Sequence, residues 1–255
     1  MEKEDINPKL EGANIIDCIP QVGECPNNCL ECFYNKRVKA KGPLTPALTP
    51  YYYNSEGFFR TKDKPLIPSL ADVGEKIVRV NSGHDSNIQK DLVLKTTEQY
   101  VKKFYCTSLP YFDFPGPVVF TCNGRDTDKS FLCVTDNLWN LMMVRFRTDM
   151  WNQELLDAAI LYYTYENQIP FTITFMRYSD IENIPLSYRD HYEIRISILN
   201  EYYCLKKECQ KEIVSRYSCF SNFVAMCGTF ESPLCRNCGR CERCYDRIMK
   251  NESSY

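Results

Sequence analysis

The chain has 255 residues, of which 44% are apolar, and its formal net charge is −2. This length allows one sizeable core, and the balanced charge argues against a strong electrostatic field for nucleic acid or membrane. The polar start of the chain lacks the features of a signal peptide, and no run of about 18 apolar residues occurs. We therefore expect a cytoplasmic protein with no membrane partner.

The cysteine content is the unusual feature of this composition. Fifteen cysteines occur, and eight of them fall into two groups of close spacing. An odd total cannot pair completely within one chain, and a reducing cytoplasm disfavours disulfide bonds. Clustered thiols in such a compartment are more often metal ligands, so the two groups are the candidate functional sites.

Short apolar segments of strand length alternate with longer segments of helical spacing along most of the chain. The segments predicted as strands are residues 13–19, 76–80, 103–108, 117–122, 140–146, 171–176 and 221–226. The segments predicted as helices are residues 30–40, 87–101, 152–167 and 192–216. The stretch 43–70, which contains proline and tyrosine, has no clear period and is predicted to be a long surface loop or lid.

This alternation indicates parallel βαβ units. The predicted fold class is α/β, a partial (β/α)6 TIM-like barrel over residues 1–226 with a short cysteine-rich C-terminal extension at 227–255. Functional side chains in such folds lie at the carboxyl ends of the strands. We expect this edge to hold Cys25, Asp85 and Asn123, each of which follows a predicted strand.

The first cysteine group consists of Cys25, Cys29 and Cys32, with the spacing C-x3-C-x2-C. Three thiolates this close can hold three irons of a cubic cluster and leave the fourth iron open to a small molecule. The rival interpretation is a zinc knuckle or buried cysteines. Zinc sites usually take two ligand pairs separated by a longer loop, so they fit this run poorly.

The segment GECPNNCLECFY around these cysteines resembles the signature of the radical S-adenosylmethionine (SAM) superfamily. The resemblance implies an oxygen-sensitive enzyme whose [4Fe-4S] cluster binds SAM. It further implies that SAM is cleaved reductively to methionine and a 5′-deoxyadenosyl radical, which abstracts a substrate hydrogen. A reductant such as flavodoxin or ferredoxin would supply the electron. The family usually has an aromatic residue before the third cysteine, where this chain has Glu31, so Phe33 and Tyr34 are the candidate contacts to the adenine side.

The resemblance also points to side chains for the methionyl part of SAM. Ser82, Gly83 and Asp85 occupy the place where family members bind the methionyl amine, and a carboxylate suits an ammonium group. The alternative is an ordinary turn with a helix cap at Asp85. The neighbouring His84 is a weak catalytic candidate that could contact SAM or substrate.

Two further positions follow later strands. By type and place, Asn123 would bind the ribose hydroxyls of SAM, as a polar residue often does in the family. Arg147 offers a guanidinium for the methionyl carboxylate, a bidentate match. The competing interpretations are loop polarity for Asn123 and a surface ion pair for Arg147.

The second cysteine group lies in the tail, where four cysteines have two-residue gaps that resemble a bacterial ferredoxin run. In ferredoxins one cysteine of the run binds another cluster, so we expect a ligand from further away. The predicted ligands of a second [4Fe-4S] cluster, or of zinc, are Cys227, Cys235, Cys238 and Cys241, with Cys244 in reserve.

The tail is also rich in arginine. Solvated basic side chains are the favoured interpretation, but the same residues could contact phosphates of a nucleic acid. The alternative function is therefore a zinc-binding protein that recognises nucleic acid. For the enzyme, the substrate remains open among a peptide, a nucleotide-like small molecule and a glycyl-radical partner protein.

Overall fold

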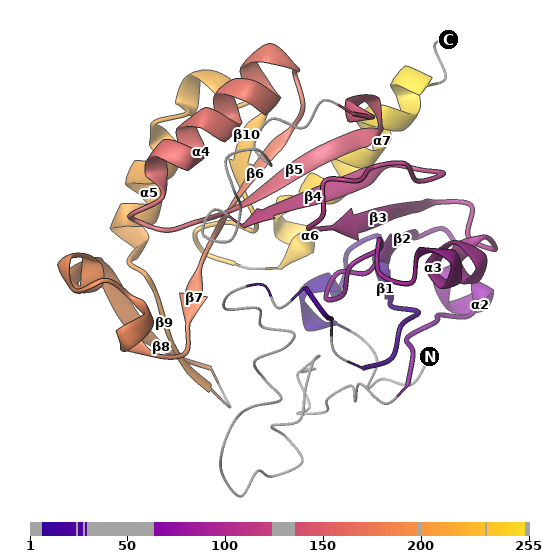
Figure 1. Cartoon of the computed structure of the whole chain (residues 1–255), viewed down its shortest axis with the longest axis horizontal. Helices are drawn as coiled ribbons and strands as arrows, with labels where there is room; N and C mark the ends of the chain where they lie inside the picture. Colours follow the sequence, from indigo (N-terminus) through magenta and orange to yellow (C-terminus); the bar gives the residue numbers. More distant parts are fainter. Residues whose placement is uncertain are drawn as a thin grey trace, which may run out of the picture.

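The computed structural model describes residues 7–23, 25–27, 29, 64–123, 136–197, 200–232 and 234–252. Its main feature is a seven-stranded sheet in the order β1-β2-β3-β4-β5-β6-β10, in which every neighbouring pair is parallel (Figure 1). The strands are β1 (Ile15–Cys18), β2 (Ile77–Val80), β3 (Lys103–Thr107), β4 (Val118–Asn123), β5 (Leu141–Thr148), β6 (Phe171–Phe175) and β10 (Val224–Met226).

The predicted α/β class with a parallel sheet is therefore confirmed. All seven strands lie where the apolar segments predicted them. The described sheet is open, because β1 and β10 are its two edges and do not pair with each other. All carboxyl ends of the strands lie at one edge of the sheet.

Helices cover one face of the sheet, which we call the outer face. They are α2 (Leu70–Val73), α3 (Lys90–Thr97), α4 (Gln153–Ile160) with its π-helical continuation η6 (Leu161–Glu166), and α5 (Lys207–Ser215). Alternate strand residues such as Val78, Phe120 and Phe146 point to this face and form one core with the helices. Strands buried on both faces are expected in a parallel sheet, and this explains their nearly continuous apolar sequence.

The opposite, inner face is covered by the tail of the chain. Cys241 and Tyr245 of α7 (Arg240–Glu252) pack there on Phe104, Met142 and neighbouring strand residues (Figure 1). The Tyr245 and Phe104 ring centroids are 6.4 Å apart. The short α6 (Cys235–Cys238) precedes α7 and ends at Gly239, whose φ of 54° gives the left-handed C-cap that glycine favours.

A second, three-stranded sheet corrects one prediction. The segment predicted as a helix from 192 to 216 instead forms the hairpin of β8 (Tyr192–Ser197) and β9 (Asn200–Leu205), followed by α5. In β8 the apolar residues Tyr192, Ile194 and Ile196 alternate and are aromatic or β-branched, which favours a strand. β7 (Arg177–Tyr178), which was not predicted, completes this sheet in the order β7-β9-β8.

The remaining elements are short. They are the 3-10 turns η2 (Pro8–Leu10), η5 (Leu138–Asn140), η7 (Ile181–Asn183), η8 (Leu186–His191) and η9 (Ser218–Phe220). The helix predicted at 87–101 is confined to α3, because Gln89 takes a left-handed conformation with φ 50° and blocks an earlier start. The helix predicted at 30–40 and most of the loop at 43–70 lie outside the described residues. Within the part of the chain that the structure describes, no helix is long and apolar enough to cross a membrane.

Candidate metal centres

The first cysteine group lies in the loop that follows β1, at the carboxyl edge of the sheet. Cys25 is 8% exposed and Cys29 is partly exposed. Between them, the side-chain amide of Asn27 donates to Asp85 Oδ2 at 2.9 Å and to Ser108 Oγ at 3.1 Å. Cys29 Sγ lies 3.8 Å from the same Ser108 Oγ. The third cysteine of the group and the aromatic residues predicted beside the adenine, Cys32, Phe33 and Tyr34, lie outside the described residues.

Asp85 is the centre of the hydrogen bonds that hold this loop. Its Oδ1 accepts from the backbone N–H of Asn87 at 2.9 Å and from Thr107 Oγ1 at 2.8 Å. Its Oδ2 accepts from Asn27, from the Ser108 N–H at 2.6 Å and from Ser108 Oγ at 2.8 Å. A carboxylate offers about four lone-pair positions, so these five donors occupy it fully. A methionyl ammonium group could join only by displacing one of them.

The residues predicted beside Asp85 form the turn that presents it. Gly83 has a φ of 152°, and Ser82 and His84 form a small β-bridge. His84 Nδ1 accepts the Asp85 N–H at 2.9 Å, which orients the imidazole toward its own backbone. From the other side, Gln21 Nε2 donates to the Asp85 carbonyl at 3.1 Å. Ser82, Gly83 and Asp85 therefore lie beside the cysteine loop, as expected, and their binding to SAM stays a prediction.

Asn123 and Arg147 are brought together by strand register. They are directly paired at the carboxyl ends of β4 and β5, and Arg147 Nη1 donates to Asn123 Oδ1 at 2.9 Å. The sequence suggested both positions separately but gave no sign that they touch. The pair presents a guanidinium and an amide at the same edge as the cysteine loop.

The inner face holds a buried ion pair that sequence reasoning missed. Arg79 on β2 donates to both carboxylate oxygens of Asp17 on β1, at 2.6 and 3.1 Å, and Asn7 Nδ2 adds a third bond to Asp17 at 2.9 Å. The signal was present, since one charged residue interrupts each of two otherwise apolar strands. Such a pair gives little net stability but is costly to break.

The tail thiols separate into two environments. Cys235 and Cys241 interact electrostatically with Cys227, Arg79 and Arg145, and Cys235 also interacts with Cys238. Burial raises the pKa of the Cys241 thiol to about 12, against the opposing effect of the two arginines. Cys227, Cys235 and Cys241 belong to the predicted ligand set, and the structure brings them to the same side of the tail.

The other two tail thiols, those of Cys238 and Cys244, lie nearer the arginines of the tail. Burial raises the pKa of the Cys244 thiol, and the neighbouring charges are Arg240, Arg247 and Arg243, with Cys238 nearby. Arg240 itself is buried and donates to the backbone carbonyls of Phe171 and Phe223, so it anchors α7 to the sheet. Among the described side chains, no three His, Cys, Asp or Glu residues are placed at the mutual spacing of a ready-made metal site.

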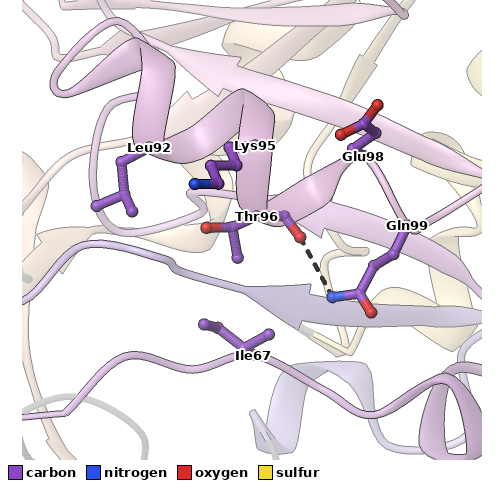
Figure 2. Close-up of a pocket in the computed structure, with 6 residues that line it drawn as sticks. All are labelled: Ile67, Leu92, Lys95, Thr96, Glu98 and Gln99. Atoms are coloured by element: carbon purple, nitrogen blue, oxygen red, sulfur yellow. Dashed lines mark hydrogen bonds between the residues drawn. The ribbon is translucent and has the colours of Figure 1, made fainter.

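A separate hollow lies between α3 and the segment that precedes α2, and it holds none of the predicted site residues. Its volume is about 670 Å³, and Figure 2 shows Ile67 across from Leu92 of α3. The polar part of its lining comes from Lys95, Thr96, Glu98 and Gln99. We assign no function to this hollow.

Comparison of the chain with protein-family models, with curated proteins and with solved structures finds no match.

Proposed function

We propose that this chain is a radical SAM enzyme, which cleaves SAM reductively and abstracts a hydrogen atom from a substrate. The observation that carries the proposal is the position of the C-x3-C-x2-C loop. Cys25 and Cys29 follow the first strand of a parallel sheet, at the carboxyl edge where α/β folds place their ligands. The loop is tied to the ends of β2 and β3 through Asn27 and Asp85, rather than left free in solvent.

The donor set fits a cluster with one open iron. Two thiols of the run lie at this edge, one of them buried, and the third, Cys32, comes seven residues after the first in the sequence. When bound, a [4Fe-4S] cluster would pass one electron from an external reductant such as flavodoxin or ferredoxin to SAM, giving methionine and a 5′-deoxyadenosyl radical. That radical would take one hydrogen atom from the substrate and so become 5′-deoxyadenosine.

The remaining edge residues supply groups that suit SAM. In this proposal Arg147 binds the methionyl carboxylate, a bidentate match for a guanidinium, while Asn123 holds that guanidinium and offers its amide N–H to the ribose. Ser82 and His84 lie beside the loop as further polar contacts. Asp85 acts by holding Asn27 and Ser108 in place.

The proposal extends to the fold and to the tail. The open parallel sheet, with seven strands rather than the six of the predicted (β/α)6 barrel, would be a partial TIM-like barrel whose carboxyl edge bounds the substrate site. The tail thiols of Cys227, Cys235 and Cys241 would hold a second centre, with Cys238 or Cys244 as the fourth ligand. Two arginines near these thiols would offset the negative charge of metal-bound thiolates. The ferredoxin-like spacing favours a second [4Fe-4S] cluster over zinc.

Single substitutions test the first centre. Protein reconstituted anaerobically with iron and sulfide should lose about four irons when Cys25, Cys29 or Cys32 becomes alanine. It should then form no 5′-deoxyadenosine. Cys219→Ala is the matched control, because Cys219 is exposed and lies outside both groups. If the loop variants keep their iron and cleave SAM as Cys219→Ala does, the proposal is wrong. A chain that binds zinc alone would support the nucleic-acid alternative instead.

A further inference from the structure

Most arginines that reach the inner face of the sheet have their hydrogen bonds met by protein groups. Arg79 is paired with Asp17, Arg240 with backbone carbonyls, and Arg147 with Asn123. These contacts provide acceptors for guanidinium groups that are largely removed from water. A buried donor without an acceptor is costly, so each partner explains why its arginine is tolerated.

Arg145 differs from these three residues. It lies on β5 two residues before Arg147, so the two side chains leave the strand on the same face. In the described part of the chain its guanidinium makes no hydrogen bond and no ion pair, and its Nε is buried without a partner. Its electrostatic neighbours are the thiols of Cys106, Cys227 and Cys241 and the guanidinium of Arg79, and none of them is a carboxylate.

An unpartnered hydroxyl group lies on the strand next to this arginine. Thr174 Oγ1 on β6 is buried without a hydrogen bond. Arg145 pairs with Thr172 and Arg147 with Thr174, so Thr174 is the diagonal neighbour of Arg145 on the same face. Both residues are partly exposed, which leaves the outer guanidinium nitrogens open to a ligand.

The other unpartnered atoms do not share this place. They include the amide oxygens of Gln21, Asn81 and Asn140, which are acceptors and lie before or after the strands. The unmatched donors of the described residues therefore gather at one point, between β5 and β6. An unsatisfied cation beside an unsatisfied hydroxyl calls for a group that is negative and accepts several hydrogen bonds.

We propose that Arg145 and Thr174 bind an oxyanion, the carboxylate or phosphate group of a small-molecule ligand. Arg145 lies about 7 Å along β5 from Arg147, given two residues at about 3.3 Å each, and Thr174 lies directly opposite Arg147, so the site adjoins Arg147. Naming this ligand as the substrate rests on the proposed function: the substrate would be an anionic small molecule, held beside SAM on the inner face. The anion-binding site itself does not depend on SAM chemistry. A second source of negative charge would be metal-bound thiolates at Cys227 and Cys241.

Thermal unfolding in phosphate and in chloride at equal ionic strength tests the site. The full chain is measured both metal-loaded and after chelation, as wild type, Arg145→Met, Arg145→Lys and Thr174→Val. Arg195→Met is the control, because Arg195 lies on β8 and is paired with Glu193. Inorganic phosphate at ten times its Kd should raise the wild-type Tm by about 3–5 °C, with or without metal.

The variants should separate clearly. Arg195→Met should keep the phosphate shift, Arg145→Lys and Thr174→Val should keep part of it, and Arg145→Met should lose it. In chloride, Arg145→Met should unfold at the wild-type Tm or above, because it removes a cation that has no partner. The proposal would be overturned if phosphate shifted the Tm of Arg145→Met as much as that of wild type, or did not shift the wild-type Tm. A marked fall in the Tm of Arg145→Met in chloride would overturn it as well. The proposal would also be overturned if Arg145→Met changed the Tm only in metal-loaded protein and phosphate shifted the Tm of no protein. That result would identify metal-bound thiolates as the negative charge that Arg145 contacts. A protein that shows the shift but cleaves no SAM would keep the anion site and refute the proposed enzyme.

Discussion

Asp85 offers a sharp test of how the cysteine loop is held, because one buried carboxylate joins the loops after β1, β2 and β3. Replacing it by alanine removes five accepted hydrogen bonds. At about 1 kcal/mol net per bond, with part of the loss recovered by water, we expect unfolding free energy to fall by about 3–5 kcal/mol. For a chain of this size that is a fall in Tm of about 6–20 °C.

Two measurements follow the effect of this substitution. Thermal unfolding gives the stability, and alkylation followed by mass spectrometry reports whether Cys25, 8% exposed in the intact loop, becomes reactive. Asp85→Asn keeps the shape and one acceptor oxygen, so we expect about half the loss. Asp113→Ala is the control, since that carboxylate is 66% exposed and its bond to Lys90 contributes about 0–1 kcal/mol.

An Asp85→Ala protein that keeps the wild-type Tm and leaves Cys25 protected would contradict this role of Asp85. A variant that loses only SAM affinity, with stability and thiol protection unchanged, would show that Asp85 contacts the ammonium group directly. The five-donor arrangement predicts that any loss of SAM affinity accompanies release of the loop.

Three further predictions concern the inner face. Arg79→Met should lower the free energy of unfolding by about 3–5 kcal/mol, measured by chemical denaturation, because it leaves the buried Asp17 carboxylate without its cation. Adding Asp17→Asn should restore part of this stability, whereas additive losses in the double variant would contradict the pairing. Burial raises the pKa of the Cys106 thiol from 9.0 to about 11, so the thiol of the unfolded chain ionises at lower pH than that of the folded chain. The free energy of unfolding of metal-free wild type should therefore fall by about 2–3 kcal/mol relative to Cys106→Val as the pH rises from about 9 to about 11. A difference between the two proteins that does not change with pH would refute this. A chain lacking residues 227–255 should be poorly soluble, because Phe104 and Met142 lose their cover, and a soluble monomer with a cooperative transition would show that α7 is dispensable.

The strands of the main sheet were predictable because their sequences are largely apolar over three to eight residues and few other arrangements bury them. The same reasoning failed at 192–216. Apolar residues near Ile213 recur at helical intervals and favoured a helix over the whole segment, whereas Ile194 and Tyr203 are paired across the hairpin of β8 and β9. Cross-strand partners come from tertiary pairing, which a local pattern does not contain.

The tail shows a different limit. Its cysteines at intervals of three residues suggest a ligand run, but Cys241, Cys244, Tyr245 and Ile248 also follow the i, i+3, i+4, i+7 pattern of a buried helix face. The structure places them on that face of α7. Ligand spacing and helix spacing coincide here, so the sequence alone could not separate the two roles.

The candidate site was predictable by position but not by contact. The sequence placed Asp85, Asn123 and Arg147 after strands, because polar residues that follow apolar runs lie at the carboxyl edge of the sheet. It did not show that Asn27 and Ser108 bind Asp85, since Ser108 is 23 residues away along the chain. Nor did it show that Arg145 lacks a partner, because that depends on every element packed around the inner face.

The proposed SAM cleavage is decided by product analysis of anaerobically reconstituted, dithionite-reduced protein incubated with SAM. We expect 5′-deoxyadenosine and methionine in equal amounts, with neither product from Cys25→Ala protein and full yield from Cys219→Ala. Reconstituted wild type that holds about four or more irons and binds SAM, yet yields no 5′-deoxyadenosine under strong reductant, would contradict it.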